Sequence, residues 1–85
     1  MKFSFTKALK IVEKTNGCCL YCKKELKFGQ MSVDHIVPKV LGGDNSINNL
    51  ALACKNCNHE KNNLTIEVYC DIFNVEICEN IKEYL

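Results

Sequence analysis

The sequence lacks several residues on which protein function often depends. It contains no tryptophan and no arginine, because all eleven basic residues are lysines, and it has a single proline. Arginine commonly reads guanine through two hydrogen bonds, so its absence argues against sequence-specific base recognition. No apolar run approaches the roughly 20 residues of a transmembrane helix, and lysines interrupt the N-terminal stretch. We therefore expect neither a membrane span nor a secretion signal.

Cysteine, by contrast, is abundant, with seven in 85 residues. A chain of this length forms one small domain, which we expect to span residues 1–85. Small domains often need a disulfide or a bound metal for stability. An odd number of cysteines fits a disulfide framework poorly. We therefore expect a reducing, cytoplasmic compartment, as in a bacterial or phage-infected cell, with the cysteines present as thiols or metal ligands.

Charge is distributed unevenly, although the net charge is only +1. Residues 1–61 contain ten lysines and five acidic residues, a net charge of +5. Residues 62–85 contain one lysine and five acidic residues, a net charge of −4. A basic front half suits contact with phosphate groups, and the alternative is ordinary surface charge.

The hydrophobic pattern predicts a mixed α+β chain. Residues 4–15 should form a helix with an apolar face of Phe5, Ala8, Leu9 and Val12, ending at Gly17. The pattern then predicts, in order, a strand over 30–34, a loop over 41–49, a strand over 50–53 and a helix over 55–63.

The last segment, 64–85, is predicted to form one or two helices. Thr65 and Asn74 are candidate N-caps. Cys70 and Cys78 have no ligand-like spacing, so we expect them to be small buried apolar residues. The expected apolar faces are Ile66, Tyr69 and Phe73, followed by Ile77, Ile81 and Tyr84.

Two matched cysteine pairs carry the strongest chemical signal. Cys19 and Cys22 enclose two residues, as do Cys54 and Cys57, and thirty-one residues separate the pairs. Two such knuckles supply four thiolates to a tetrahedral zinc with no open position, so the site should be structural. Cys18 could compete as a ligand, but its spacing does not match the second pair. The alternative is four buried free thiols.

An Asp34-His35 pair lies between the knuckles, before Pro38. The functional interpretation makes His35 a general base and Asp34 a ligand for a hard divalent cation. Adjacent strand residues point to opposite faces, so both serve one site only if the strand bends or ends there, as Pro38 allows. The alternative is a surface polar pair.

Together these segments resemble the HNH endonuclease family, whose fold is the ββα-metal motif. The resemblance covers about residues 18–63 and implies a small zinc-stabilised α+β domain. This core motif would carry an N-terminal helix and, over 64–85, an extension of one or two helices. The residues that carry it are Cys19 and Cys22, Val33 to Pro38, Leu41-Gly42-Gly43, Asn49-Leu50, and Cys54, Cys57, Asn58 and Lys61.

The resemblance implies a role for each matching residue. His35 would activate water, and Asn49 would brace the loop between the strands and help to hold the histidine. Asn58 stands where the family often has its last histidine, giving an H-N-N variant, and would hold Mg²⁺ or Mn²⁺ together with Asp34. His59 is a rival for that position, but one residue of helix rotates it away from the face of Asn58.

The implied activity is metal-dependent hydrolysis of DNA, one strand per active site and largely independent of sequence. Lys61 and Lys39 would contact phosphate, or else are plain exposed lysines. Two alternatives remain open: a non-catalytic zinc-knuckle module that binds nucleic acid, and an accessory subunit of a larger DNA-processing machine such as a phage packaging complex. In the second, the acidic C-terminal helices would bind a protein partner or a second copy.

Overall fold

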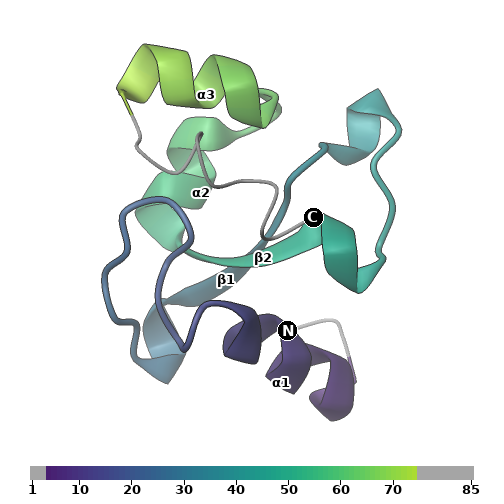
Figure 1. Ribbon diagram of the computed structural model, residues 1–85, viewed down its shortest axis with the longest axis vertical. Coiled ribbons are helices and arrows are strands. Elements are labelled where there is room, and N and C mark those ends of the chain that lie inside the picture. The colour runs from purple at the N-terminus through teal and green to yellow at the C-terminus, as the bar shows by residue number, and fades with distance from the viewer. Residues whose placement is uncertain (1–3, 75–85) are drawn as a thin grey trace.

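The computed structural model describes residues 4–74 of the chain. Two strands lie in the middle of the molecule, with α1 on one side and α2 and α3 on the other (Figure 1). This arrangement confirms the expected α+β class. The helices and strands are α1 (Phe5–Lys14), β1 (Met31–His35), β2 (Leu50–Cys54), α2 (Lys55–Lys61) and α3 (Ile66–Phe73).

The two strands pair antiparallel, from Met31 opposite Cys54 to His35 opposite Leu50. The first four residues of β2 are apolar and fully buried. Helix α1 packs against β2, while α2 packs against both strands. Because β2 is covered on both sides, it forms the centre of the core and has a continuous apolar sequence instead of an alternating one.

Helix α1 begins where Ser4 caps it, with the Ser4 hydroxyl accepting a hydrogen bond from the Lys7 amide at 3.2 Å. It ends before Asn16 and Gly17, which both adopt positive φ, as the predicted stop at Gly17 requires. The predicted apolar face is wrong in part. Phe5 is 82% exposed and Leu9 46% exposed, whereas Ile11 is the residue that packs fully into the core.

The remaining boundaries differ from the predictions by one or two residues. Strand β1 reaches His35, β2 includes Cys54, and α2 ends at Lys61 because Asn62 turns to φ +50°. The predicted loop over 41–49 contains the short 3₁₀ turn Ile47–Asn49 and the last residue of another, Lys39–Leu41. A third such turn, Phe28–Gln30, precedes β1.

Thr65 caps α3 as predicted, accepting a hydrogen bond from the Val68 amide at 3.3 Å. Asn74 is not an N-cap: it ends α3 in the left-handed conformation, a position that asparagine tolerates well. Cys70 is buried as expected, but it is disulfide-bonded and not a thiol. The predictions for Ile77, Cys78, Ile81 and Tyr84 lie outside the described residues. Within residues 4–74, no helix has the length and hydropathy needed to span a membrane.

Candidate functional site

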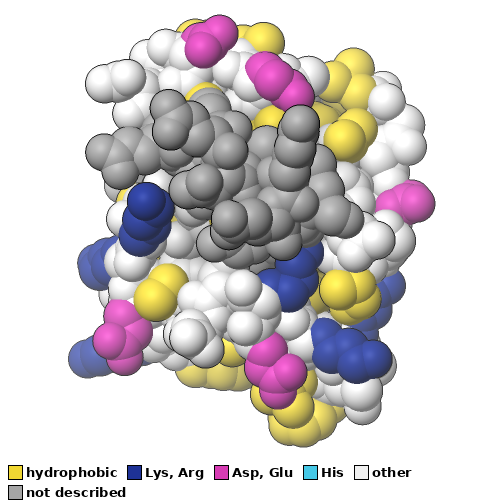
Figure 2. Space-filling view, in the orientation of Figure 1, with side chains coloured by type: hydrophobic (Ala, Val, Ile, Leu, Met, Phe, Trp, Pro, Cys, Tyr) yellow, Lys and Arg dark blue, Asp and Glu magenta, His cyan; other side chains and the backbone are white. Residues whose placement is uncertain are grey.

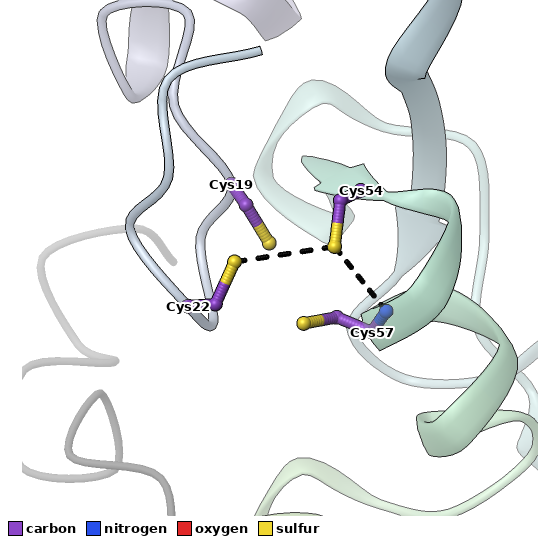
Figure 3. A group of neighbouring side chains, drawn as sticks. All are labelled: Cys19, Cys22, Cys54 and Cys57. Atoms are coloured by element: carbon purple, nitrogen blue, oxygen red, sulfur yellow. Dashed lines mark hydrogen bonds between the residues drawn. The ribbon is translucent and has the colours of Figure 1, made fainter.

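The structure brings the four predicted cysteine ligands together. The sulfur atoms of Cys19, Cys22, Cys54 and Cys57 all lie within 4.8 Å of one another, and those of Cys22 and Cys54 are 3.9 Å apart (Figure 3). Four thiolates around a tetrahedral zinc, at about 2.3 Å each, would lie about 3.8 Å from one another. The cluster therefore fits zinc in both donor chemistry and spacing.

Local backbone geometry aims each cysteine pair at this point. In the first knuckle the Cys19 amide donates to the Lys24 carbonyl, and Lys23 turns the chain back with φ +65°. In the second, the Cys54 sulfur caps α2 by accepting from the Cys57 amide at 3.3 Å. Cys18 lies outside the cluster and contacts the Asn16 carbonyl.

The thiols of the cluster differ in acidity. Burial raises the pKa of Cys57. Burial acts in the same direction on Cys54, but hydrogen bonds from the Cys57 amide and from neighbouring thiols outweigh it and lower the Cys54 pKa. A lowered pKa favours the thiolate, which is the form that binds metal.

Asp34 is 3% exposed, on the side of β1 from which Lys61 of α2 approaches. One carboxylate oxygen accepts a hydrogen bond from the hydroxyl of Tyr21, a residue inside the first knuckle. The Lys61 ammonium is 3.4 Å from each carboxylate oxygen. Burial raises the pKa of Asp34, while the Tyr21 hydroxyl and Lys61 act in the opposite direction. Burial and the neighbouring carboxylate raise the pKa of Tyr21, so its hydroxyl remains a donor.

Lys61 does not lie where the sequence predicted. Its side chain is 0% exposed, and its ammonium donates to the backbone carbonyl of His35 at 2.9 Å as well as pairing with Asp34. An enclosed ammonium cannot reach a phosphate group, so the expected phosphate contact of Lys61 is wrong in this structure. Lys39, on the loop after β1, is exposed as expected.

His35 ends β1 and is partly exposed. Its Nε2 lies 2.7 Å from the side-chain oxygen of Asn45, in the loop between the strands. When Nε2 carries the proton and donates to this oxygen, Nδ1 is the ring nitrogen that can accept a proton. The contact to the imidazole ring thus comes from Asn45, whereas the resemblance assigned that support to Asn49.

Asn49 is buried and fixes the loop in which Asn45 lies. Its side-chain oxygen accepts from the Val37 amide at 2.8 Å, and its side-chain nitrogen donates to the carbonyls of Val37 and Asp44. The backbone at Gly43 lies close to the Val37 carbonyl, and only a glycine fits there, because a Cβ would overlap that carbonyl. The bracing expected of Asn49 therefore corresponds to three hydrogen bonds across the loop.

Asn58 faces β1, and His59 does not. The Asn58 side-chain nitrogen donates to the Ser32 hydroxyl at 3.0 Å and to the Val33 carbonyl at 3.3 Å, so its amide oxygen is free of both bonds. His59 is exposed. The Asn58 amide oxygen, a potential metal ligand, thus lies close to Val33, the residue that precedes Asp34. His59 lies on the solvent side of α2.

Three residues that support this site were not identified from the sequence. Tyr21 lies inside the first cysteine pair, Asn45 lies in the predicted loop over 41–49, and Lys14 lies in the predicted helix over 4–15. The Lys14 ammonium donates to the carbonyls of Ile47 at 2.8 Å and Leu50 at 2.7 Å, which ties α1 to the turn before β2 and to the first residue of β2. A lysine at the end of an amphipathic helix is the only sequence signal for this contact, and it is a weak one.

The fold and site define a class of protein: a strand–strand–helix unit that carries an Asp-His pair at the end of its first strand and is stapled by four cysteines. The family model of the HNH endonucleases matches residues 19–74. The chain belongs to the HNH endonuclease family, as the sequence predicted.

Two relatives are consistent with this assignment. The chain is 32% identical over 66 residues to the CRISPR-associated endonuclease Cas9 of Corynebacterium diphtheriae, a match that covers 76% of this chain and 6% of Cas9. It also resembles the crystal structure of the Type II-C Cas9 enzyme from Actinomyces naeslundii, with a TM-score of 0.68 and 32% identity. That match covers 76% of this chain and 8% of the enzyme, so each likeness concerns one small part of a large protein.

Proposed function

We propose that this protein is a metal-dependent endonuclease that hydrolyses DNA phosphodiester bonds and cuts one strand per active site. The observation that supports this most directly is the placement of His35. His35 stands at the end of β1, and Asn45 holds one nitrogen of its imidazole ring at 2.7 Å. A base oriented by a second side chain is the arrangement that general-base catalysis requires.

In this proposal His35 takes a proton from the attacking water at Nδ1. Asn45 accepts the hydrogen bond from Nε2 and thereby selects the tautomer with a free Nδ1. The Lys61 ammonium, through the His35 carbonyl, fixes the backbone from which the imidazole extends. The buried Asn49 side chain positions the loop that carries Asn45, and Asn45 in turn bonds the imidazole of His35.

Asp34 and Asn58 are the proposed donors for Mg²⁺ or Mn²⁺. A carboxylate and an amide oxygen are the hard ligands that such cations prefer, and the two side chains come from elements that pack together. When bound, the cation would neutralise charge on the phosphate and the leaving oxygen. Because Asp34 is enclosed by Tyr21 and Lys61, we expect its carboxylate to turn, or Lys61 to withdraw, when the cation enters.

The DNA-binding surface in this proposal comes from the basic front half of the chain. On the face shown in Figure 2, the visible lysine side chains all lie below α3, with acidic side chains among them, and other acidic side chains lie over α3 at the top. Lys39 is exposed on the loop that begins after β1 and His35. Contacts from lysines to phosphate, without arginine, support binding that is largely independent of sequence.

A nicking assay on supercoiled plasmid tests the proposed function. The wild type should convert supercoiled to open-circular DNA only with Mg²⁺ or Mn²⁺ present. His35→Ala should reduce the rate by about a hundredfold to ten-thousandfold, the usual contribution of a general base. His59→Ala is the matched control, because it removes an exposed imidazole from the neighbouring helix. Nicking by His35→Ala at the wild-type rate would show that another group is the base.

An accessory role in a larger DNA-processing complex is the second candidate. It is favoured by the exposed apolar side chains of α3, where Val68 is 43%, Ile72 63% and Phe73 42% exposed, alongside acidic residues. A protein partner or a second copy would cover this face. The same plasmid assay separates the candidates, because an accessory subunit or a non-catalytic binding module would bind DNA without nicking it.

A further inference from the structure

The side chain of Tyr21 connects the four-cysteine cluster to the Asp34-His35 pair, two sites that were predicted separately from the sequence. Tyr21 lies between Cys19 and Cys22 in the first knuckle, and it is 4% exposed. Its ring packs edge-to-face on Tyr69, with centroids 5.2 Å apart and planes at 77°. Its hydroxyl donates to Asp34. A residue of the metal knuckle therefore contacts the carboxylate of the Asp-His pair directly.

Backbone contacts leave the Tyr21 side chain little freedom. The amide of Leu20, the preceding residue, donates to the Leu52 carbonyl at 2.9 Å, so the knuckle is tied to the central strand. The cysteines on either side of the Leu20-Tyr21 segment belong to the sulfur cluster. The position of the hydroxyl is therefore set by the same geometry that brings the four sulfurs together.

The Asp34 carboxylate is held from two directions. Tyr21 approaches from the knuckle, and Lys61 approaches from the end of α2 at 3.4 Å. Lys61 alone would neutralise the charge, but an ammonium on a flexible stem fixes direction poorly. The phenolic hydroxyl, on a ring packed in the core, supplies the directional contact.

We propose that Tyr21 is a positioning residue, which orients the Asp34 carboxylate for catalysis and thereby links the state of the four-cysteine site to the active site. The inference rests on the proposed nuclease function. It implies that metal loss or thiol oxidation at the knuckle withdraws the hydroxyl from Asp34. Damage to the cysteine site would then abolish cleavage through the displaced Asp34 carboxylate, in addition to its effect on the stability of the domain.

The experiment compares Tyr21→Phe with Tyr69→Phe in the full chain. Each change removes one phenolic hydroxyl from a pair of rings in edge-to-face contact, but the Tyr69 hydroxyl bonds Glu60, at 3.5 Å, and the Cys57 thiol, and not Asp34. Both variants should fold and hold one zinc. Tyr21→Phe should lower kcat for nicking by about tenfold to a hundredfold, the scale of a hydrogen bond to a charged acceptor. It should also raise the Mg²⁺ concentration for half-maximal rate, and leave KM for DNA unchanged. Tyr69→Phe should match the wild type in all three.

A second measurement does not depend on cleavage. The unfolding equilibrium of zinc-bound Tyr21→Phe, Asp34→Ala and the double variant forms a mutant cycle. The effect of the double variant on the unfolding equilibrium constant should be about tenfold smaller than the product of the two single effects. Both changes remove the same hydrogen bond, so its loss is counted once. A cycle without coupling overturns the inference, as does wild-type nicking by Tyr21→Phe. A wild type that never nicks DNA overturns the proposed function itself, even where the cycle shows coupling.

Discussion

Replacing Lys61 by methionine tests the buried ion pair on which the site is built. Lys61 is 0% exposed and Asp34 3% exposed, with the ammonium 3.4 Å from each carboxylate oxygen. Methionine keeps much of the length and volume of the side chain but removes the charge. Among residues 4–74, the Tyr21 hydroxyl would then be the one donor left to the buried Asp34 carboxylate, and the His35 carbonyl would lose its bond at 2.9 Å.

The expected loss of unfolding free energy is about 3–5 kcal/mol, because breaking one partner of a buried pair leaves an uncompensated charge. That is a large share of the total stability of a small domain, which is about 5–15 kcal/mol. Burial already raises the pKa of Asp34, and without Lys61 it should rise further. The loss should therefore be largest above the folded-state pKa of Asp34. It should shrink as pH falls through that pKa, because protonation removes the buried charge.

Urea unfolding of the zinc-bound protein, followed by circular dichroism at neutral and mildly acidic pH, gives the free energies. Lys10→Met is the matched control, because Lys10 is exposed on α1 and its loss should cost no more than about 0.5 kcal/mol. Adding Asp34→Asn to Lys61→Met should restore part of the stability, since both charges are then absent. A Lys61→Met variant as stable as the wild type at neutral pH would refute the buried pair.

Three further predictions concern metals and DNA. Removing zinc with a chelator should unfold the domain, because a structural zinc supplies about 10–16 kcal/mol of apparent binding energy, and a zinc-free chain with a native circular dichroism spectrum would exclude this role. Asn58→Ala should raise the Mg²⁺ or Mn²⁺ concentration needed for half-maximal nicking, whereas His59→Ala should change it little, and the reverse pattern would move the metal ligand by one residue. Binding to unrelated duplexes should be weak, with Kd near 10⁻⁴ to 10⁻⁶ M at physiological salt, and should weaken steeply as salt rises; tight, sequence-selective and salt-insensitive binding would contradict it.

The parts of this fold that depend on local sequence could be predicted. Cysteine pairs that enclose two residues, a capping threonine and a glycine with positive φ each act within one turn of chain, so their spacing is visible in the sequence. The order of elements in the ββα unit followed from the same kind of signal. The face of α1 that would be buried could not be predicted in this way, because it depends on which side meets β2.

The interior of the site was not predictable from local patterns. Lysine is rarely buried, so a surface position for Lys61 was the natural expectation, and only its charged partner on β1 makes burial tolerable. The Tyr21–Asp34 bond joins residues thirteen apart, and the Asn45–His35 contact depends on how the intervening loop folds. Such contacts depend on tertiary packing, which a single sequence records only indirectly.

The two hydrogen bonds that Lys14 donates, one to the turn before β2 and one to the first residue of β2, have a practical consequence for anyone excising this domain. The match to the family begins at residue 19, after α1 has ended. A truncation at that point would remove the fully buried Ile11 and free the carbonyls of Ile47 and Leu50, beside the loop that supports His35. A portable cassette, for fusion to a targeting domain of chosen specificity, should therefore retain the chain from the Ser4 cap onward.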